Sequence, residues 1–485
     1  MKKTFLLIMA LFAMNLANAA IKLPKVIGDN MVLQRNSNVN LWGEASPNKT
    51  VKIKTSWNGK QYSVKSDNDG NWKVAVVTSS EGGPYTIEIT DGEKLELKNI
   101  LLGEVWICSG QSNMEMPVKG FVNQPVENAA KYITEASQYP QIRMFTVERN
   151  SIDEAPQKDC KGGEWLTSTP KSVADFSATG YFFGYTLNKM LNIPIGLITT
   201  NWGGSTIETW MTKESISSIP GVNMEVISNY KNDNARAQAL YNGMINPIKN
   251  FTAKGFIWYQ GESNRGNYYD YASLMKKMIE LWRTEWNDQE MPFYMVQLAP
   301  YNYEGAQYRS LPLVIEAQYK AASELKHCDV AATTDIGHPQ CIHPSRKLQV
   351  GQRLAYLALA NDYGIEGLPA NSPTYKSLEI KDNKVVLSFN NVNNDNSFCG
   401  FSTTGVNSFE GFEIAGEDQV FYPAQANLVW WQNKMEVKSD NVAKPVAVRY
   451  GFANFSTANV TTALGLPLVP FRTDNWDIPQ NQIFK

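Results

Sequence analysis

Cysteine is scarce in this chain, and its spacing argues against two classes of protein. The five cysteines are scattered, and no two of them form a CxxC pair. An odd number of widely spaced cysteines does not build a disulfide framework, and the missing CxxC spacing argues against a metal site of that kind. At most two disulfides can form among Cys108, Cys160, Cys328, Cys341 and Cys399.

An excess of charge of one sign is also absent. The 45 basic and 47 acidic residues leave a formal net charge of −2. This balance is near enough to neutral that no nucleic acid or other polyanion is expected as a partner. The sequence does not specify an oligomeric state. Its 485 residues, 43% of them hydrophobic, are enough for about two or three domains with buried cores.

Long apolar runs are missing except at the N-terminus. Residues 1–19 carry Lys2 and Lys3, an apolar stretch over 5–14, and the small-residue pattern Ala17-Asn18-Ala19. This pattern predicts a secretory signal peptide cleaved after Ala19, since its apolar part is too short to span a bilayer. We therefore expect a secreted or periplasmic protein without a membrane span.

Three regions of the remaining chain differ in their hydrophobic pattern. Residues 20–98 alternate apolar and polar residues over short stretches, which predicts a small β-sandwich. Residues 99–365 alternate short apolar runs with amphipathic segments, which predicts an α/β fold with a parallel sheet and helices on both faces. Residues 366–485 return to strand-like alternation and predict a second β domain. The strands expected in the middle region are 100–108, 196–200, 255–259, 293–298 and 330–334, and the expected helices are 181–190, 271–286, 313–325 and 347–359.

Polar clusters follow four of these expected strands. They are Ser109–Asn113, Asn201–Ser205, Gln260–Asn264 and the longer stretch Asp335–Pro344. In open parallel α/β sheets, ligands bind beyond the carboxyl ends of the strands. The joint placement of the clusters therefore predicts a single site at that edge.

Histidine is rarer still, and its scarcity narrows the chemistry. A nucleophilic serine such as Ser112 requires a base, which is usually a histidine near neutral pH. Of the three histidines, His327 lies at the end of an amphipathic segment, where a surface position is favoured. His338 and His343 lie in the loop after the last strand. The base is therefore His338 or His343.

An ester hydrolase also stabilises an oxyanion with hydrogen-bond donors aimed at the developing charge. Gly204, the backbone N–H at Ser112, and the amide of Gln260 or Asn264 are candidate donors. The alternative reading is structural, because Gly, Ser and Asn mark ordinary turns and Glu262 suits a helix cap. The chemistry alone leaves an α/β protein with polar loops as an open alternative.

The clusters resemble the sialate O-acetylesterases, a branch of the SGNH hydrolases. The resemblance runs in order through nearly the whole chain after residue 19. Its blocks are Asn30–Arg35, Gly110–Met114, Trp202–Ser205, Leu240–Met244, Trp258–Asn264, Ile342–Pro344 with Lys347, and Phe471–Trp476.

The resemblance implies a flavodoxin-like SGNH domain flanked by β-sandwich-type domains, and a serine esterase that removes O-acetyl groups from sialic acid or sialoglycans without metal or cofactor. Carried over by position, Ser112 is the nucleophile and His343 the general base. The oxyanion hole would comprise the N–H of Ser112, Gly204 and the amide of Gln260. Candidate supporting residues in the matching blocks are Gln111, Asn113, Glu262 and Asn264.

One departure concerns the acid that orients the histidine. Many SGNH enzymes carry an aspartate two or three residues before it, but these positions hold Cys341 and Gln340 here. Either the enzyme uses a Ser–His dyad, with Gln340 or a backbone carbonyl holding the ring, or Asp335 supplies the acid. Asp335 also forms a DxxH spacing with His338, although Pro344 and Lys347 favour His343.

Alternative functions share these residues. The same ester chemistry would serve acetylated plant glycans such as xylan. A non-catalytic glycan-binding protein is a second class of function. A glycosidase that uses Glu262 is a third, but a glycosidase needs a pair of carboxylates and the sequence offers no partner for Glu262. For a sialic acid substrate, Arg265 is a candidate to bind the sugar carboxylate.

Overall fold

The computed structural model describes residues 21–368, 370–392 and 400–485. The expected signal peptide therefore lies outside the described residues. In the part of the chain that the structure describes, no helix has the length and apolar character required to cross a bilayer. Cys399 is not described, and the other four cysteines have free thiols.

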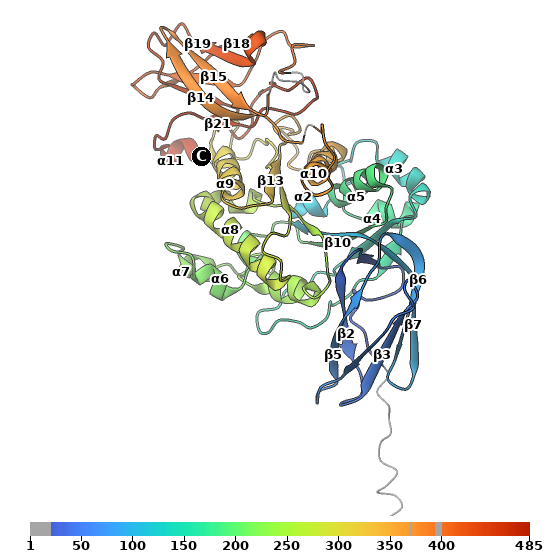
Figure 1. Ribbon diagram of the computed structural model, residues 1–485. Coiled ribbons are helices and arrows are strands. Elements are labelled where there is room, and N and C mark those ends of the chain that lie inside the picture. Colours follow the sequence, from blue (N-terminus) through green and yellow to red (C-terminus); the bar gives the residue numbers. More distant parts are fainter. Residues whose placement is uncertain (1–20, 369, 393–399) are drawn as a thin grey trace, which may run out of the picture.

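A parallel sheet forms the centre of the molecule (Figure 1). Its strands are almost wholly buried and read as continuous apolar runs, as expected for a sheet covered on both faces. Without β8 the strand order is that of flavodoxin-like folds, 2-1-3-4-5. In spatial order the strands are β8 (Ile142–Thr146), β10 (Ile195–Asn201), β7 (Lys94–Gly110), β11 (Gly255–Tyr259), β12 (Phe293–Val296) and β13 (Cys328–Ala331), with antiparallel β9 (Trp165–Thr167) beside β8.

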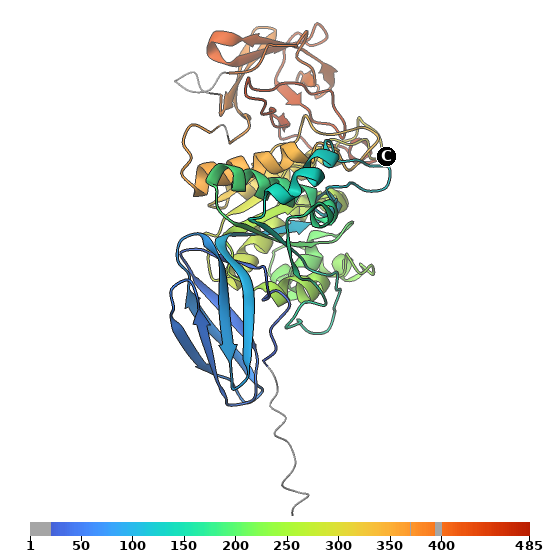
Figure 2. The ribbon, with the colours of Figure 1, turned by 90° about the vertical axis from the view of Figure 1, so that its right-hand side faces the viewer.

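Two pairs of helices cover this sheet. α5 (Ala178–Leu191) and α10 (Lys347–Asp362) pack together on one face, and α8 (Tyr268–Glu285) and α9 (Ser310–Ser323) on the other (Figures 1 and 2). Gly351 permits the close approach of α10 to α5, because a Cβ there would lie 2.6 Å from Cβ of Phe182. The predicted α/β fold class is thus confirmed. Shorter helices are α3 (Ala129–Glu135), α4 (Pro170–Asp175), α6 (Lys213–Ser217) and α7 (Met224–Ser228).

The N-terminal β region continues directly into the central sheet through β7. The first part of β7 pairs with antiparallel β6, and its second part pairs with parallel β10 and β11. One hydrophobic core extends through both regions. The domain boundary at residues 98/99, which falls inside β7, stays a prediction. The strands are β1 (Val32–Gln34), β2 (Asn38–Glu44), β3 (Thr50–Thr55), β4 (Gln61–Lys65), β5 (Asn71–Val77) and β6 (Gly82–Thr90).

The C-terminal β region has a hydrophobic core of its own. Two four-stranded antiparallel sheets enclose it, and the short helix α11 (Gln480–Ile483) brings Ile483 against Leu313 of α9. The boundary at residues 365/366 likewise stays a prediction. The strands are β14 (Thr374–Lys381), β15 (Lys384–Asn390), β16 (Phe412–Ala415), β17 (Phe421–Pro423), β18 (Gln425–Val429), β19 (Lys434–Lys438), β20 (Ala447–Tyr450) and β21 (Phe471–Arg472).

Candidate active site

Ser112 lies at the carboxyl edge of the central sheet. β7 ends at Gly110, and the four-residue helix α2 (Ser112–Glu115) begins two residues later, after Gln111. Gly110 has a φ of 142°, and a Cβ there would lie 2.2 Å from the carbonyl oxygen of Tyr259. Only glycine lets β7 turn this close to β11. This turn directs the chain at Ser112 away from the end of the strand.

His343 is the histidine that the structure brings to Ser112. Its Nε2 lies 2.8 Å from Oγ of Ser112. His338 is exposed and accepts a hydrogen bond from the backbone N–H of Gln340, and His327 is exposed after α9. The sequence left His338 and His343 open as the base, and the geometry favours His343.

The other imidazole nitrogen contacts a residue that the sequence analysis missed. Nδ1 of His343 lies 2.6 Å from Oε1 of Gln124. The turn that carries Gln124 also places Phe121 edge-on against the imidazole, with ring centroids 5.1 Å apart. No sequence motif marks this turn, which lies 219 residues from His343.

Asp335 was expected to orient the histidine, but in the structure it binds two arginines. Its two carboxylate oxygens accept hydrogen bonds from Arg353 of α10 at 2.7 and 2.8 Å, and Arg346 lies 3.6 Å away. No hydrogen bond links it to His343 within the described chain. The physical reason is the buried guanidinium of Arg353, which requires a counter-charge. Gln124, and not Asp335 or Gln340, occupies the position next to Nδ1.

The backbone N–H groups of Ser112 and Gly204 have no acceptor among the described residues, and neither does that of Asn113. The turn at Gly203 and Gly204 lies against the serine, because a Cβ on Gly203 would be 3.3 Å from Cβ of Ser112. Gly204 adopts a φ of 72°, which favours glycine. Glu115 fixes the turn by accepting from the Gly203 N–H at 2.6 Å.

The amide of Gln260 is not available as a third donor. Its Nε2 donates to the carbonyl oxygen of Ser205 at 2.9 Å and to Oδ1 of Asn264 at 2.7 Å. The hydroxyl of Tyr271 donates to its Oε1 at 2.8 Å, and the whole side chain is buried. Gln260 and Asn264 thus hold the neighbouring loops in place through buried hydrogen bonds. Asn264 also donates a hydrogen bond to Glu208.

A buried charged network lies directly behind Ser112. Asn113 donates to Oε1 of Glu262 at 2.6 Å and accepts from Nζ of Lys347 at 2.5 Å. Burial raises the pKa of Glu262 and lowers that of Lys347 to about 7. Burial, with a smaller contribution from the charge of Lys347, also lowers the pKa of His343 to about 4. Gln111 connects this layer to the next loop, since its Oε1 accepts from the N–H of Gly261 at 3.3 Å.

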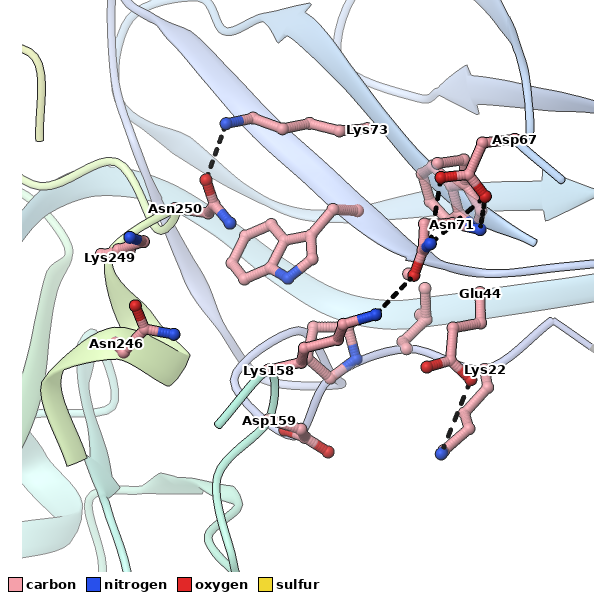
Figure 3. Close-up of a pocket in the computed structure, with 15 residues that line it drawn as sticks. Lys22, Glu44, Asp67, Asn71, Lys73, Lys158, Asp159, Asn246, Lys249 and Asn250 are labelled. Carbon is pink, nitrogen blue, oxygen red and sulfur yellow. Dashed lines mark hydrogen bonds and ion pairs between the residues drawn. The ribbon is translucent and has the colours of Figure 1, made fainter. Parts of the chain in front are cut away.

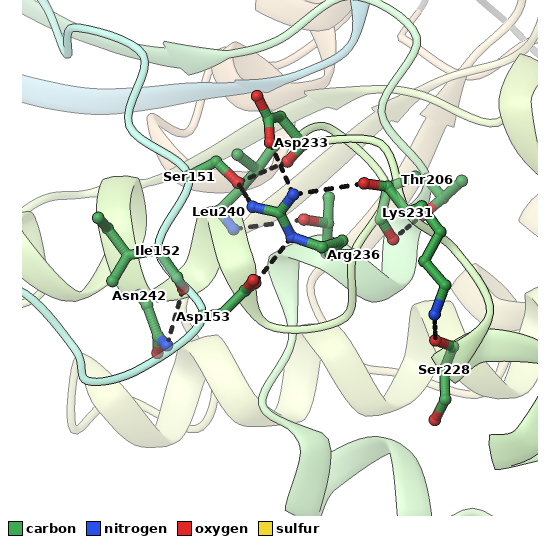
Figure 4. Close-up of polar contacts among 12 residues, drawn as sticks. Ser151, Ile152, Asp153, Thr206, Ser228, Lys231, Asp233, Arg236, Leu240 and Asn242 are labelled. Atoms are coloured by element: carbon green, nitrogen blue, oxygen red, sulfur yellow. Dashed lines mark hydrogen bonds and ion pairs between the residues drawn. The ribbon is translucent and has the colours of Figure 1, made fainter.

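A second loop, which Arg236 anchors (Figure 4), braces the glycine turn. Asn234 donates to the carbonyl oxygen of Gly203 at 2.7 Å. Arg236 anchors the loop through Asp153 at 2.9 Å, Asp233 at 2.7 Å and the hydroxyl of Ser151 at 3.1 Å. The chain near residues 151–153 is thereby tied to the turn that carries Gly204.

A cavity of about 340 Å³ opens next to α2, and its lining includes Glu115 of α2 and Phe121, which contacts His343, but neither Ser112 nor His343 itself. Arg149 lies over the ring of Trp202, 5.2 Å from its centroid, and pairs with Glu115. Glu115, Glu148 and Asp175 also border the cavity, and they are paired with Arg149, Lys161 and Lys119 respectively.

Arg265 does not reach this cavity. Its guanidinium is bound to Glu304 at 2.7 and 2.8 Å and to the hydroxyl of Ser310 at 2.8 Å, and it stacks on Tyr303 at 3.6 Å. Each of these contacts holds Arg265 in the protein interior. The basic residue with unused donors near Ser112 is instead Arg149.

The chain matches a family model described as carbohydrate esterase, sialic acid-specific acetylesterase, over residues 102–360, more than half of its length. The chain belongs to this family. It is accordingly a carboxylic ester hydrolase. The matched residues include Ser112, Gly204 and His343.

Relatives of this esterase cover most of the chain. The sialate O-acetylesterase of Mus musculus is 27% identical over 431 residues, covering 75% of this chain and 77% of the relative. That of Homo sapiens is 28% identical over 417 residues, covering 78% of each. A solved structure of a carbohydrate acetylesterase from Xanthomonas citri is 36% identical, with a TM-score of 0.85, and covers 94% of this chain and 100% of that one. This likeness covers the flanking β regions as well as the central sheet.

Proposed function

We propose that the protein is a secreted or periplasmic serine esterase that removes O-acetyl groups from sialic acid. The observation that carries the proposal is the 2.8 Å hydrogen bond between Oγ of Ser112 and Nε2 of His343. It lies at the carboxyl edge of the sheet, where α/β proteins bind ligands. The family and the sialate O-acetylesterase relatives support the choice of substrate.

In the proposed reaction, Oγ of Ser112 attacks the acetyl carbonyl carbon while Nε2 of His343 accepts the hydroxyl proton. The carbonyl oxygen becomes an oxyanion, which the N–H groups of Ser112 and Gly204 stabilise. His343 then returns the proton to the departing sugar oxygen, leaving acetyl-Ser112. Water attacks this ester with His343 as the base again, and acetate leaves as Ser112 regains its proton.

Gln124 is the proposed positioning residue. Its Oε1 can only accept, so the 2.6 Å contact requires the proton of the neutral imidazole on Nδ1. That tautomer leaves a lone pair on Nε2, directed at Ser112. A neutral amide thus selects the tautomer that the base requires, and no carboxylate is assigned this role.

A neutral acetylated glycan, such as acetylated xylan, is the second candidate substrate. Each acidic side chain of the cavity next to α2 is paired with a basic one, so the cavity has no surplus positive charge to favour an anionic sugar. For sialic acid, Arg149 is the proposed partner of the carboxylate, since it is half exposed and pairs with Glu115 through only one of its nitrogens.

The test compares acetate release from O-acetylated sialic acid and from acetylated xylan by the wild type, Ser112→Ala and the matched control Ser263→Ala. Ser263 is exposed in a neighbouring loop. We expect release from the sialic acid that Ser112→Ala abolishes and Ser263→Ala preserves. Release from xylan alone would retain the chemistry and replace the substrate. Release by Ser112→Ala at the wild-type rate would refute the nucleophile. Mass spectrometry after reaction with an organophosphonate should find the label on Ser112.

The signal peptide is tested separately. Expression of the full chain in a Gram-negative host should give a periplasmic protein whose N-terminal sequence begins at Ala20. An N-terminus that still carries residues 1–19 would contradict secretion through cleavage.

A further inference from the structure

A second cavity lies between strands β2 and β5 of the N-terminal β region and the segment 246–250 (Figure 3). Its volume is about 400 Å³, within the range of small-molecule sites. No residue lines both this cavity and the one next to α2. We propose that it is a second saccharide-binding site, which takes a sugar unit bearing a carboxylate.

Trp42 supplies the aromatic wall of this cavity. It is 9% exposed, and its indole N–H has no hydrogen-bond partner in the described chain. It lies opposite Lys73 in the strand register, whereas the side chain of Trp72 lies on the other face of β5. An indole offers both an apolar face and an N–H donor, the combination that a sugar ring and its hydroxyls match.

Amide side chains add further hydrogen-bonding groups. Asn250 accepts from Nζ of Lys73 through Oδ1 at 2.7 Å, which leaves its Nδ2 without a partner among the described residues. Asn246 donates through Nδ2 to the carbonyl oxygen of Gln157, which leaves its Oδ1 free in the same sense. A free donor and a free acceptor on the same wall suit a polyhydroxylated ligand.

Two lysines at the rim of the cavity are the reason to expect a carboxylate on the ligand. Nζ of Lys73 is bound to Asn250, and Nζ of Lys158 to Oδ1 of Asn71 at 3.3 Å, so both ammonium groups contact amides and not carboxylates (Figure 3). Lys73 lies opposite Trp42 in the strand register and therefore on the same face. Burial and the nearby charge of Lys249 lower the pKa of Lys73, as expected for a cation without an anionic partner.

The acidic side chains of the same cavity are already engaged. Glu44 lies 3.7 Å from Lys22, and Asp159 lies 3.2 Å from Lys25. Asp67 accepts from the side chain of Asn71 and from the backbone N–H groups of Asp69 and Asn71. Lys249 is likewise bound to Glu285. Lys73 and Lys158 therefore remain as the cations that can bind a ligand carboxylate.

The binding test uses the full chain without its signal peptide, labelled with 5-fluorotryptophan and titrated with N-acetylneuraminic acid, glucuronic acid or xylose. The variant Trp42→Phe identifies the fluorine signal of Trp42. We expect a saturable shift of that signal with one or both acidic sugars and none with xylose. The acid that binds more tightly identifies the source of the carboxylate. An absent shift, or an equal shift with xylose, would overturn the proposal.

The variant Lys158→Gln separates this site from the one at Ser112. It should weaken acidic-sugar binding at the Trp42 signal at least about tenfold, as expected for one charge-assisted hydrogen bond. The matched control Lys65→Gln, an exposed lysine of β4, should leave the affinity unchanged. Both variants should release acetate from a small ester at the wild-type rate. Unchanged affinity in Lys158→Gln would refute the assigned charge.

Discussion

Oε1 of Gln124 lies 2.6 Å from Nδ1 of His343, in the position where serine hydrolases commonly place a carboxylate. An amide oxygen fixes the ring and its tautomer as a carboxylate does. It carries no net charge, however, and therefore stabilises the imidazolium less. The imidazole is also partly buried near the charge of Lys347, and its pKa falls to about 4.

Replacing Gln124 by glutamate should restore the missing charge. A carboxylate next to Nδ1 favours the imidazolium, so the pKa of His343 should rise and the acidic limb of kcat/KM should move to higher pH. Gln124→Ala should instead lower kcat by about 10²-fold or more, because loss of tautomer control costs about 10⁴ in a full triad. Stopped-flow kinetics across pH 3–9 would measure both effects. Identical profiles for wild type and Gln124→Glu would remove Gln124 from the mechanism.

The wild-type pH profile follows from the same pKa. His343 acts as a base only when neutral, so activity should rise with pH through the pKa of the free enzyme. Because that pKa is lowered from 6.5 to about 4, kcat/KM should reach its plateau near pH 5 and lose activity below pH 4. A half-maximal value near pH 6.5 would show that burial does not depress this pKa.

The sequence predicted the central sheet well because its strands are buried on both faces. The predicted strands 196–200 and 255–259 agree with the observed β10 (Ile195–Asn201) and β11 (Gly255–Tyr259) to within one residue at each end. Strand β8 was missed because its apolar run is short and interrupted by Arg143, although in three dimensions it pairs with β10 on one side and β9 on the other. β7 is longer than expected because one strand serves two sheets, a tertiary relation that local periodicity does not contain.

In the candidate site, too, some residues could be predicted from the sequence and others could not. Ser112, Gly204 and His343 follow strands, so their meeting could be inferred from topology alone. Gln124 could not, because a glutamine in a loop carries no signature of its contact. Gln260 looked like a donor because it follows β11, but Ser205, Asn264 and Tyr271 saturate its amide. Hydrogen-bond satisfaction is visible only in three dimensions.

Asp335 should contribute to the stability of the fold and not to the pKa of the catalytic base His343. Asp335→Ala leaves the buried guanidinium of Arg353 without its counter-charge, which should lower the free energy of unfolding by about 3 kcal/mol. The acidic limb of kcat/KM should not move. Urea denaturation measures the first effect, with Asp440→Ala, an exposed aspartate, as the control. A shifted limb at unchanged stability would return Asp335 to the catalytic group.

Gly204→Ala should impair catalysis more than binding. Alanine is strained at a φ of 72°, and its Cβ would lie 3.0 Å from Nδ2 of Asn234, so the turn and its N–H must move. Loss of one oxyanion donor costs about 10²–10³ in kcat, and we expect a decrease toward that range with KM little changed. Gly266→Ala is the control, because no atom lies within 4 Å of its Cβ. Equal kcat values for the two variants would exclude Gly204 from the oxyanion hole.

Arg149 provides the sharpest distinction between the two candidate substrates. If its free guanidinium donors bind the sialic carboxylate, Arg149→Met should raise KM for O-acetylated sialic acid by about tenfold, the cost of a charge-assisted hydrogen bond. KM for acetylated xylan should stay unchanged, and Arg149→Lys should restore part of the loss on sialic acid. A rise in KM on both substrates would mean that Arg149 acts through Glu115 and the Gly203 turn. Unchanged KM on both would favour a neutral glycan as the substrate.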